Sequence, residues 1–321
     1  MLPKENMLRA IRRDRPAWVP CGAEATFTIE PPLLERPYSA GYDVFGVHWT
    51  FEAQAEGGTY PTPTTPVITD LRRWRDQVAI PDVAGADWSN VAAAIAALDR
   101  DQVLVQGFVH MGLFERSYLL LGMEEALVNY ALEPDLMSDL LDALADYKIA
   151  VITTFHEVAH LDMVWYGDDW GTQDRLFLSP SLWRRVIKPH TQRIYDCMKA
   201  RGILINQHSC GRIEAIFGDV VEMGADMWNP CQPCNDLAHL KRTYGDRIAF
   251  FGGLDSQFVL GCPGATPDDV WREVRRRIDE MAPGGGYIAA PSHDVPYDPD
   301  LLWAMRDEID GYGRAFYRGT A

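Results

Sequence analysis

The chain of 321 residues is longer than most single domains, but α/β barrels reach this length as one unit, and its composition is that of a globular protein. A formal net charge of −16 argues against nucleic acid as a partner, because phosphate groups call for a basic surface. We expect a cytoplasmic protein, since no apolar run approaches the roughly 18 residues of a membrane span and no secretory signal is recognisable.

The first part of the chain predicts little regular structure. A short helix is expected over residues 4–14 and a first strand at residues 18–21, which Pro16 and Pro20 limit to a strand start or edge. Residues 31–75 are rich in proline, glycine and aromatic side chains and show no sustained period. Such a long loop is usually a functional cover or disordered, and its aromatic content disfavours disorder. We therefore predict an ordered flap over one mouth of the fold.

From residue 88 onwards, apolar strands alternate with helices joined by short connections. Strands are expected at residues 102–109, 162–167, 203–205, 226–229, 247–252 and 286–290. Helices are expected at 88–98, 113–121, 124–132, 134–160, 180–201 with a kink at Pro189, 213–221, 237–244, 267–281 and 299–317.

This order predicts a parallel sheet covered by helices. No glycine-rich dinucleotide fingerprint follows the first strand, which disfavours an open doubly wound sheet. We therefore predict a closed (β/α)8 TIM barrel with an N-terminal extension, formed by residues 1–321 as a single domain. Its eighth strand is expected before residue 103.

In such a barrel, the polar residues that follow each strand meet at one mouth, where the active site lies. Many of them also have an ordinary structural interpretation, such as a helix cap or a buried thiol. Neighbouring aspartates usually point in opposite directions, so at most one of Asp168 and Asp169 is expected to face the mouth. The residues at these strand ends are His110, Asp168, Asp169, His208, Cys210, Asn229, Cys231, Cys234, Asp255, Gln257, Ser292, His293 and Asp294.

His208 and Cys210 are two apart at the end of a strand, so their side chains are expected to leave it on the same face. An imidazole beside a thiol suits zinc. His293 follows the last strand, and a His, Cys, His set would leave the fourth zinc position for water or substrate. The alternative is a histidine bonded to the backbone beside an inert thiol. Cys231 and Cys234 form a single CxxC, which favours structural thiols, with either as an extra ligand.

Five segments make the chain resemble the uroporphyrinogen decarboxylase superfamily, over roughly residues 100–315. They are GDDWGTQ, SPSLWRRVIKPH, HSCGRIEAIFGDVVEMGADMWNP, LKRTYGDRIAFFGGLDSQ and GGGYIAAPSHDVPYDP. The resemblance implies a (β/α)8 barrel. One branch, the true decarboxylases, acts without a metal and carries an N-terminal arginine-rich segment of the type RQAGR. Residues 18–24 of this chain, WVPCGAE, stand in its place.

The chain is more similar to the other branch, the zinc methyltransferases that work with corrinoid proteins. Their metal is bound by a His-x-Cys after a central strand, which His208 and Cys210 match, and by a cysteine after the last strand. Here His293 stands near that last position, so the resemblance implies His293 as the third ligand. It also implies zinc, methylcobalamin carried by a partner corrinoid protein, and a small methylated compound or thiol as substrate. Asp168 is expected to join His208 and Cys210 in catalysis. The residues expected to contact the substrate are Gln173, Asn229, Asp255 and His110.

Two alternatives of other classes stay open. The first is a metal-free decarboxylase acting on a tetrapyrrole or another carboxylated ligand. The second is a barrel that only binds a ligand or a corrinoid partner. The sequence is silent on whether the chain forms a homo-oligomer, because aromatic residues near the flap would serve a partner subunit as well as a substrate.

Overall fold

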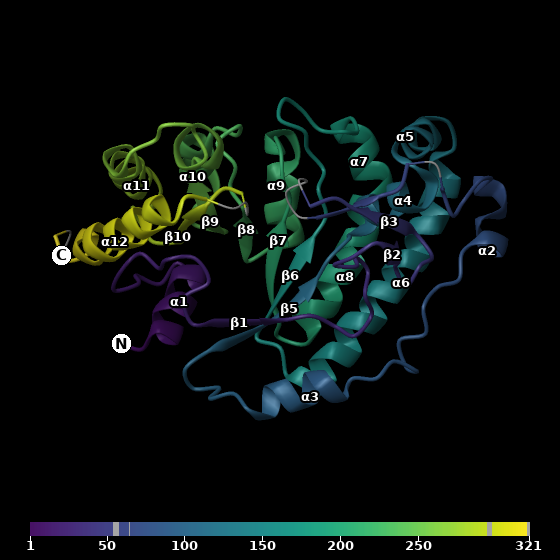
Figure 1. The fold of residues 1–321 in the computed structure, drawn as a ribbon, viewed down its shortest axis with the longest axis horizontal. Coiled ribbons are helices and arrows are strands. Elements are labelled where there is room, and N and C mark those ends of the chain that lie inside the picture. The colour runs from purple at the N-terminus through teal and green to yellow at the C-terminus, as the bar shows by residue number, and fades with distance from the viewer. Residues whose placement is uncertain (54–57, 64, 294–296, 320–321) are drawn as a thin grey trace.

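The computed structural model describes residues 1–53, 58–63, 65–293 and 297–319, and its centre is one curved parallel sheet (Figure 1). Seven strands lie in the order β1-β5-β6-β7-β8-β9-β10, and each neighbouring pair is parallel. Their bounds are Thr26–Ile29 (β1), Leu104–Val109 (β5), Met163–Gly167 (β6), Leu204–His208 (β7), Met227–Asn229 (β8), Ala249–Leu254 (β9) and Tyr287–Pro291 (β10).

The β10 edge of this sheet pairs with the chain just before β1. Cys21 forms a parallel bridge with Ala289, and Gly22 N donates to Ala289 O at 2.8 Å. Ala289 N in turn donates to Pro20 O at 2.9 Å. Pro20 has no N–H with which to extend the pairing. The strand expected at residues 18–21 is therefore reduced to this one bridge, and the regular first strand is β1.

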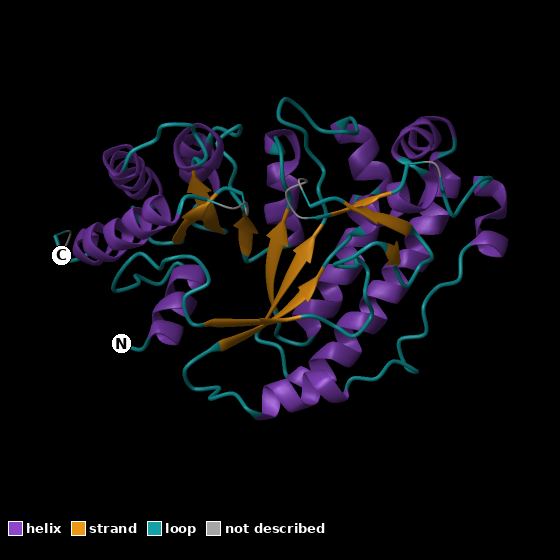
Figure 2. Cartoon of the chain, viewed as in Figure 1, coloured by secondary structure: helices purple, strands orange, loops and turns teal. Residues whose placement is uncertain are grey.

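Helices surround the sheet (Figure 2). The sequence explains where they begin: Thr266 and Asp269 form a reciprocal capping box at the start of α11, with Pro267 at its first position. The helices are Pro3–Arg12 (α1), Trp74–Gln77 (α2), Ser89–Ala96 (α3), Leu113–Leu121 (α4), Met123–Leu132 (α5), Pro134–Ala159 (α6), Pro180–Val186 (α7), Lys188–Ala200 (α8), Glu214–Met223 (α9), Leu237–Tyr244 (α10), Pro267–Met281 (α11) and Pro299–Phe316 (α12), with short turns at Leu71–Arg73 (η1) and Ser256–Leu260 (η2).

A second, antiparallel sheet lies within residues 31–75, which the sequence left without regular structure. Its strands are Gly41–Tyr42 (β2), His48–Phe51 (β3) and Thr59–Pro61 (β4), in that order. Two buried ion pairs tie this segment to helices: Asp43 with Arg116 of α4 at 2.6 Å, and Glu35 with Lys148 of α6 at 2.7 Å. Its role as a cover over the barrel mouth stays a prediction.

The TIM-barrel-like α/β fold is confirmed, with two corrections. Among the described residues the main sheet has seven strands: β1 is the additional strand expected before residue 103, the segment 18–21 contributes only the Cys21 bridge, and the rest of that stretch holds β2 to β4, η1, α2 and α3. The helix expected over 180–201 is two helices, since Pro189 lies in the first turn of α8 and lacks the N–H that would continue α7. None of the described helices combines the length and apolar character needed to cross a membrane.

Candidate metal centre

Three potential metal ligands converge where β6 and β7 end. His208 is the last residue of β7, and Cys210 Sγ lies 3.4 Å from His208 Nε2. Asp169, two residues beyond β6, places Oδ1 3.5 Å from the same Nε2 and accepts the N–H of Cys210 at 2.7 Å. Within the described ranges, these three residues are the His, Cys, Asp and Glu side chains whose ligand atoms all lie within 4.8 Å of one another.

The spacing of these atoms fits a tetrahedral ion. Zinc ligands about 2.0 to 2.3 Å from the metal lie about 3.3 to 3.8 Å from one another in a tetrahedral site. The observed separations of 3.4 and 3.5 Å fall in this range. Nitrogen, sulfur and carboxylate oxygen are also the donor types that zinc takes, and three protein ligands leave a fourth position open. The residues present therefore fit zinc.

Cys210 lies in surroundings that oppose its ionisation. Burial raises the pKa of the Cys210 thiol well above its usual range, and the negative charge of Asp169 raises that pKa further. Because a bound cation favours the thiolate, metal binding would reverse this shift and release the thiol proton. Without such a cation, the chemistry of Cys210 is that of an inert neutral thiol.

The loop that carries Cys210 is locked to the loop after β6. Gly211 has a φ of +79°, and a Cβ on this residue would lie 2.2 Å from the carbonyl carbon of Gly171. Arg212 N donates to Thr172 O at 2.7 Å, and Gly211 N donates to Gln232 Oε1 at 2.6 Å. A glycine is therefore required here both for its left-handed conformation and for the close approach of the two backbones.

Asp168, which the sequence analysis assigned to catalysis, is not among these three ligands. It is fully buried, and its carboxylate accepts hydrogen bonds from Phe114 N at 3.1 Å and Glu115 N at 2.9 Å, in the first turn of α4. Trp170 Nε1 donates a third at 2.9 Å. Burial raises the pKa of Asp168 to about 6. In this structure Asp168 caps a helix, which is the structural interpretation that the sequence left open.

Two other predicted residues lie beside His208. Asn229, the last residue of β8, places Oδ1 2.5 Å from His208 Nδ1. The His110 ring lies 5.4 Å from the ring of Trp165, which in turn lies 4.4 Å from the His208 ring. Burial and the neighbouring charge of His208 lower the pKa of His110 to about 3, so His110 is neutral at ordinary pH.

The remaining predicted residues are not brought into this group. His293 is exposed, its N–H donates to Ser256 Oγ at 3.0 Å, and its side chain is not among the three converging ligands. Asp255 caps the turn η2 by accepting the N–H groups of Gln257 and Phe258. Gln173 is exposed on the loop after β6. Asp294 lies outside the described residues.

The cysteines of the CxxC also stay outside it. Cys231 is buried and its thiol donates to Trp228 O at 3.2 Å, as expected of a structural thiol. Cys234 Sγ accepts a hydrogen bond from Asn235 Nδ2 at 3.5 Å. Neither residue belongs to the Asp169, His208, Cys210 group.

The sequence analysis did not assign two acidic residues to the candidate site. Asp169 was named as a strand-end residue but not as a ligand. Its place beside Cys210 follows from the register that pairs Gly167 with His208, since Asp169 and Cys210 each lie two residues further on. Glu115, in α4, was missed entirely. Its pKa is raised well above its usual range by burial and by the charges of Asp169 and Asp168.

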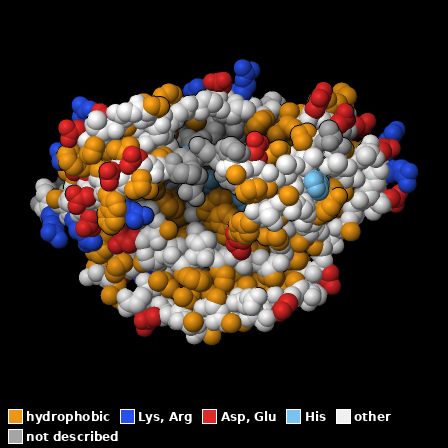
Figure 3. Space-filling view, viewed as in Figure 1, with side chains coloured by type: hydrophobic (Ala, Val, Ile, Leu, Met, Phe, Trp, Pro, Cys, Tyr) orange, Lys and Arg blue, Asp and Glu red, His pale blue; other side chains and the backbone are white. Residues whose placement is uncertain are grey.

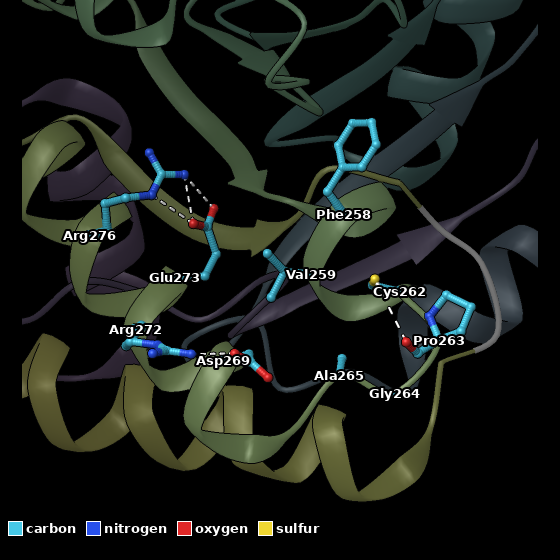
Figure 4. A pocket seen from close by; sticks show the side chains of 10 residues that line it. All are labelled: Phe258, Val259, Cys262, Pro263, Gly264, Ala265, Asp269, Arg272, Glu273 and Arg276. Carbon is cyan, nitrogen blue, oxygen red and sulfur yellow. Dashed lines mark hydrogen bonds and ion pairs between the residues drawn. The ribbon is translucent and has the colours of Figure 1, made fainter.

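One cavity of the surface is lined by residues outside this group. On the face in Figure 3, charged side chains gather mostly toward the edges, and hydrophobic side chains lie in and around the central hollow. A cavity of about 410 Å³ lies between residues 258–265 and the start of α11 (Figure 4). Its arginines are already paired, Arg272 with Asp269 and Arg276 with Glu273, so they are not free to bind an anion.

Comparison with known proteins agrees with the fold and leaves the activity divided. The family described as Uroporphyrinogen decarboxylase (URO-D) matches residues 42–305. A uroporphyrinogen decarboxylase of Methylococcus capsulatus is 28% identical over 198 residues, covering 58% of this chain and 51% of that protein. The methylcobamide:CoM methyltransferase MtaA of Methanosarcina barkeri is 28% identical over 179 residues, covering 54% of this chain and 49% of that protein.

The chain spans about half the length of these two curated relatives. Among solved structures, an L-ribulose 3-epimerase is 11% identical, with a TM-score of 0.39, covering 92% of this chain and 96% of that one. A likeness this remote says nothing about the chemistry of this chain.

Proposed function

Because the chain belongs to the uroporphyrinogen decarboxylase (URO-D) family, we propose that it is a zinc-dependent methyltransferase of a corrinoid system. It would move a methyl group between a small methylated compound or thiol and a corrinoid carried by a partner protein. The observation that carries the proposal is the convergence of Asp169, His208 and Cys210 in a spacing that suits zinc. The name of one relative, the methylcobamide:CoM methyltransferase MtaA, supports the reaction class.

In this proposal His208 Nε2, Cys210 Sγ and the Asp169 carboxylate hold the ion. Zinc, when bound, supplies a Lewis acid that lowers the pKa of a substrate thiol. The ring of Trp165 packs against His208 and limits water on that side of the site. Contacts of the substrate with Gln173, Asp255 and His110 stay predictions, as does a contribution from His293.

A metal-free decarboxylase is the second candidate, because the majority of the curated relatives carry that name. The charges near the site do not favour a substrate with many carboxylates. Two cations between the small sheet and the barrel, Arg116 and Lys148, are already paired with Asp43 and Glu35. The acidic residue beside the site is instead Asp169, whose carboxylate lies 3.5 Å from His208 Nε2.

Metal analysis of the native protein tests the proposal most directly. Protein purified without chelators is expected to contain about one zinc ion per chain, and the Cys210→Ala variant should lose it. Loss of methyl transfer from free methylcobalamin to 2-mercaptoethanol should accompany the loss of zinc. The Cys262→Ala variant is the matched control, because Cys262 is exposed and lies outside the site.

Absence of stoichiometric metal in the native protein would count against the methyltransferase. Release of carbon dioxide from uroporphyrinogen, unchanged in Cys210→Ala, would select the decarboxylase instead. Ligand binding that survives loss of both His208 and Cys210, without turnover, would indicate a barrel that only binds.

A further inference from the structure

We infer that Trp165 and Asn229 are positioning residues that hold the imidazole of His208 in one tautomer, with Nδ1 protonated and Nε2 free to bind a metal. The purpose of this arrangement rests on the proposed function, but the tautomer itself is a property of the metal-free protein. An experiment can therefore contradict the tautomer without contradicting the proposed function, and the reverse.

The argument begins with the indole of Trp165, which can only donate a hydrogen bond. Trp165 Nε1 lies 3.2 Å from the side-chain atom assigned as Oδ1 of Asn229. An amide nitrogen at that position would set two donors against each other. The atom facing Trp165 must therefore be the oxygen, which removes the usual ambiguity in the orientation of an asparagine amide.

A chain of buried amides continues in the orientation that Trp165 sets. Asn229 Nδ2 donates to Asn206 Oδ1 at 2.5 Å, and Asn206 Nδ2 donates to Gln106 Oε1 at 3.1 Å. Gln106 Nε2 then donates to Thr28 Oγ1 at 3.0 Å. These residues come from β8, β7, β5 and β1, and every amide donates in the same direction. A flip of Asn229 alone would break bonds at both of its ends, and a reversal of the whole chain, which the Thr28 hydroxyl could accept, would still lose the bond from Trp165.

The orientation of Asn229 determines the tautomer of His208 through the oxygen of its amide. His208 Nδ1 lies 2.5 Å from that Oδ1, which can only accept, so Nδ1 carries the hydrogen. A neutral imidazole has one N–H, so its other nitrogen, Nε2, presents a lone pair. Nε2 is the atom that faces Cys210 Sγ and Asp169 Oδ1. Partners of this kind set the tautomer and ring orientation of metal-binding histidines.

Trp165 also fixes the plane of the His208 ring. The two ring centroids are 4.4 Å apart with an interplanar angle of 35°, and Trp165 itself stacks on Phe108 at 4.1 Å and 22°. One side chain therefore restrains His208 twice, by ring contact and through the hydrogen bond to Asn229. A substitution that keeps the ring and removes the N–H can separate these two contributions.

The test reads the tautomer by long-range ¹H–¹⁵N correlation of the histidine rings in metal-free protein at pH 8.5. The His208 signals are assigned by their loss in His208→Gln. We expect the Nδ1–H form in the wild type and a mixture in Asn229→Leu. Asn229→Asp, which keeps an oxygen acceptor toward His208, should restore the Nδ1–H form. Trp165→Phe, which keeps an aromatic ring, should also give a mixture.

Zinc affinity, measured by competition with a chelator, is the second readout. Asn229→Leu and Trp165→Phe should bind zinc roughly 10- to 100-fold more weakly, while Asn229→Asp should lose less. Trp303→Phe is the matched control, because Trp303 is 69% exposed on α12 and should change neither readout. Thermal unfolding confirms that each variant is folded.

The Nε2–H tautomer in the wild type, or an equal mixture of the two forms, would overturn the inference even if the protein binds zinc. An Nδ1–H tautomer in a protein that takes up no metal would leave the inference standing and remove the proposed function.

Discussion

The carboxylates of Asp168 and Asp169 have different hydrogen-bond partners, although the two residues are adjacent in the chain. Asp168 accepts the N–H groups of Phe114 and Glu115 at the start of α4, whereas Asp169 accepts the N–H of Cys210 and lies 3.5 Å from His208 Nε2. One aspartate thus holds a helix in place and the other faces the candidate metal ligands. Substitutions at the two positions should therefore have separable effects.

Replacing Asp169 by alanine should weaken zinc binding with little loss of stability. Removal of a ligand should cost at least as much as removal of an outer partner, roughly 10- to 100-fold in affinity. Competition with a chelator measures the affinity, and Asp174→Ala, an exposed aspartate on the same loop, is the control. Equal affinities in the two variants would exclude Asp169 from the metal site.

Replacing Asp168 by alanine should instead destabilise the fold by about 2 to 4 kcal/mol, because it leaves buried N–H groups at the start of α4 without acceptors. Chemical denaturation measures the free energy of unfolding. Asp298→Ala is the matched control, since Asp298 caps the exposed start of α12 and its loss should cost about 1 kcal/mol. Equal losses in both variants would contradict the buried-cap assignment.

Gly211→Ala should disrupt the candidate metal site through the backbone. The added methyl group would collide with Gly171, and the left-handed conformation of residue 211 disfavours alanine. We expect zinc content well below that of the wild type, measured by elemental analysis on folded protein. Gly311→Ala, at an exposed position of α12 with open space around it, should keep full zinc content and gain about 1 kcal/mol of stability.

Lys241 provides a pH-dependent prediction far from these ligands. Burial, followed by the charge of Arg13, lowers the pKa of Lys241 to about 8 from an ordinary value of 10.5. Between pH 8 and 10.5 the unfolded chain binds more protons at this group than the folded chain, so its contribution to stability rises with pH. The charged amine therefore costs the fold on the order of 3 kcal/mol below pH 8.

The Lys241→Met variant removes this titration. As the pH rises from 8 to 10.5, the free energy of unfolding of the wild type should increase relative to that of Lys241→Met. Urea denaturation at each pH measures both values. A difference that stays constant across this interval would show that Lys241 keeps its ordinary pKa.

The sequence predicts the barrel and two of the three candidate ligands because both depend on local patterns. Apolar strands alternating with capped helices mark the parallel sheet, and the two-residue spacing of His208 and Cys210 places both on one face of β7. The choice between Asp168 and Asp169 depends on where β6 stops, and a shift of one residue exchanges their directions. Local patterning alone does not determine that end.

Contacts between distant segments are harder to predict. His293 as a ligand stays a prediction, because the direction of its side chain depends on the loop after β10, whose backbone bonds to Ser256. The small sheet of β2 to β4 has short strands that show no period, and its link to α4 and α6 through Asp43 and Glu35 joins residues far apart in sequence. Neither arrangement leaves a signal within one segment.

All three candidate ligands come from the ends of β6 and β7, while the turns after β9 and β10 contribute none of them. Because of this one-sided arrangement, the turns after β9 and β10 can change in sequence while the ends of β6 and β7 stay the same. Under the proposed function, insertions, deletions or grafted peptides after β9 and β10 should change which molecules are accepted without altering the three candidate ligands. Laboratory evolution aimed at new substrates should therefore begin with libraries confined to those two turns.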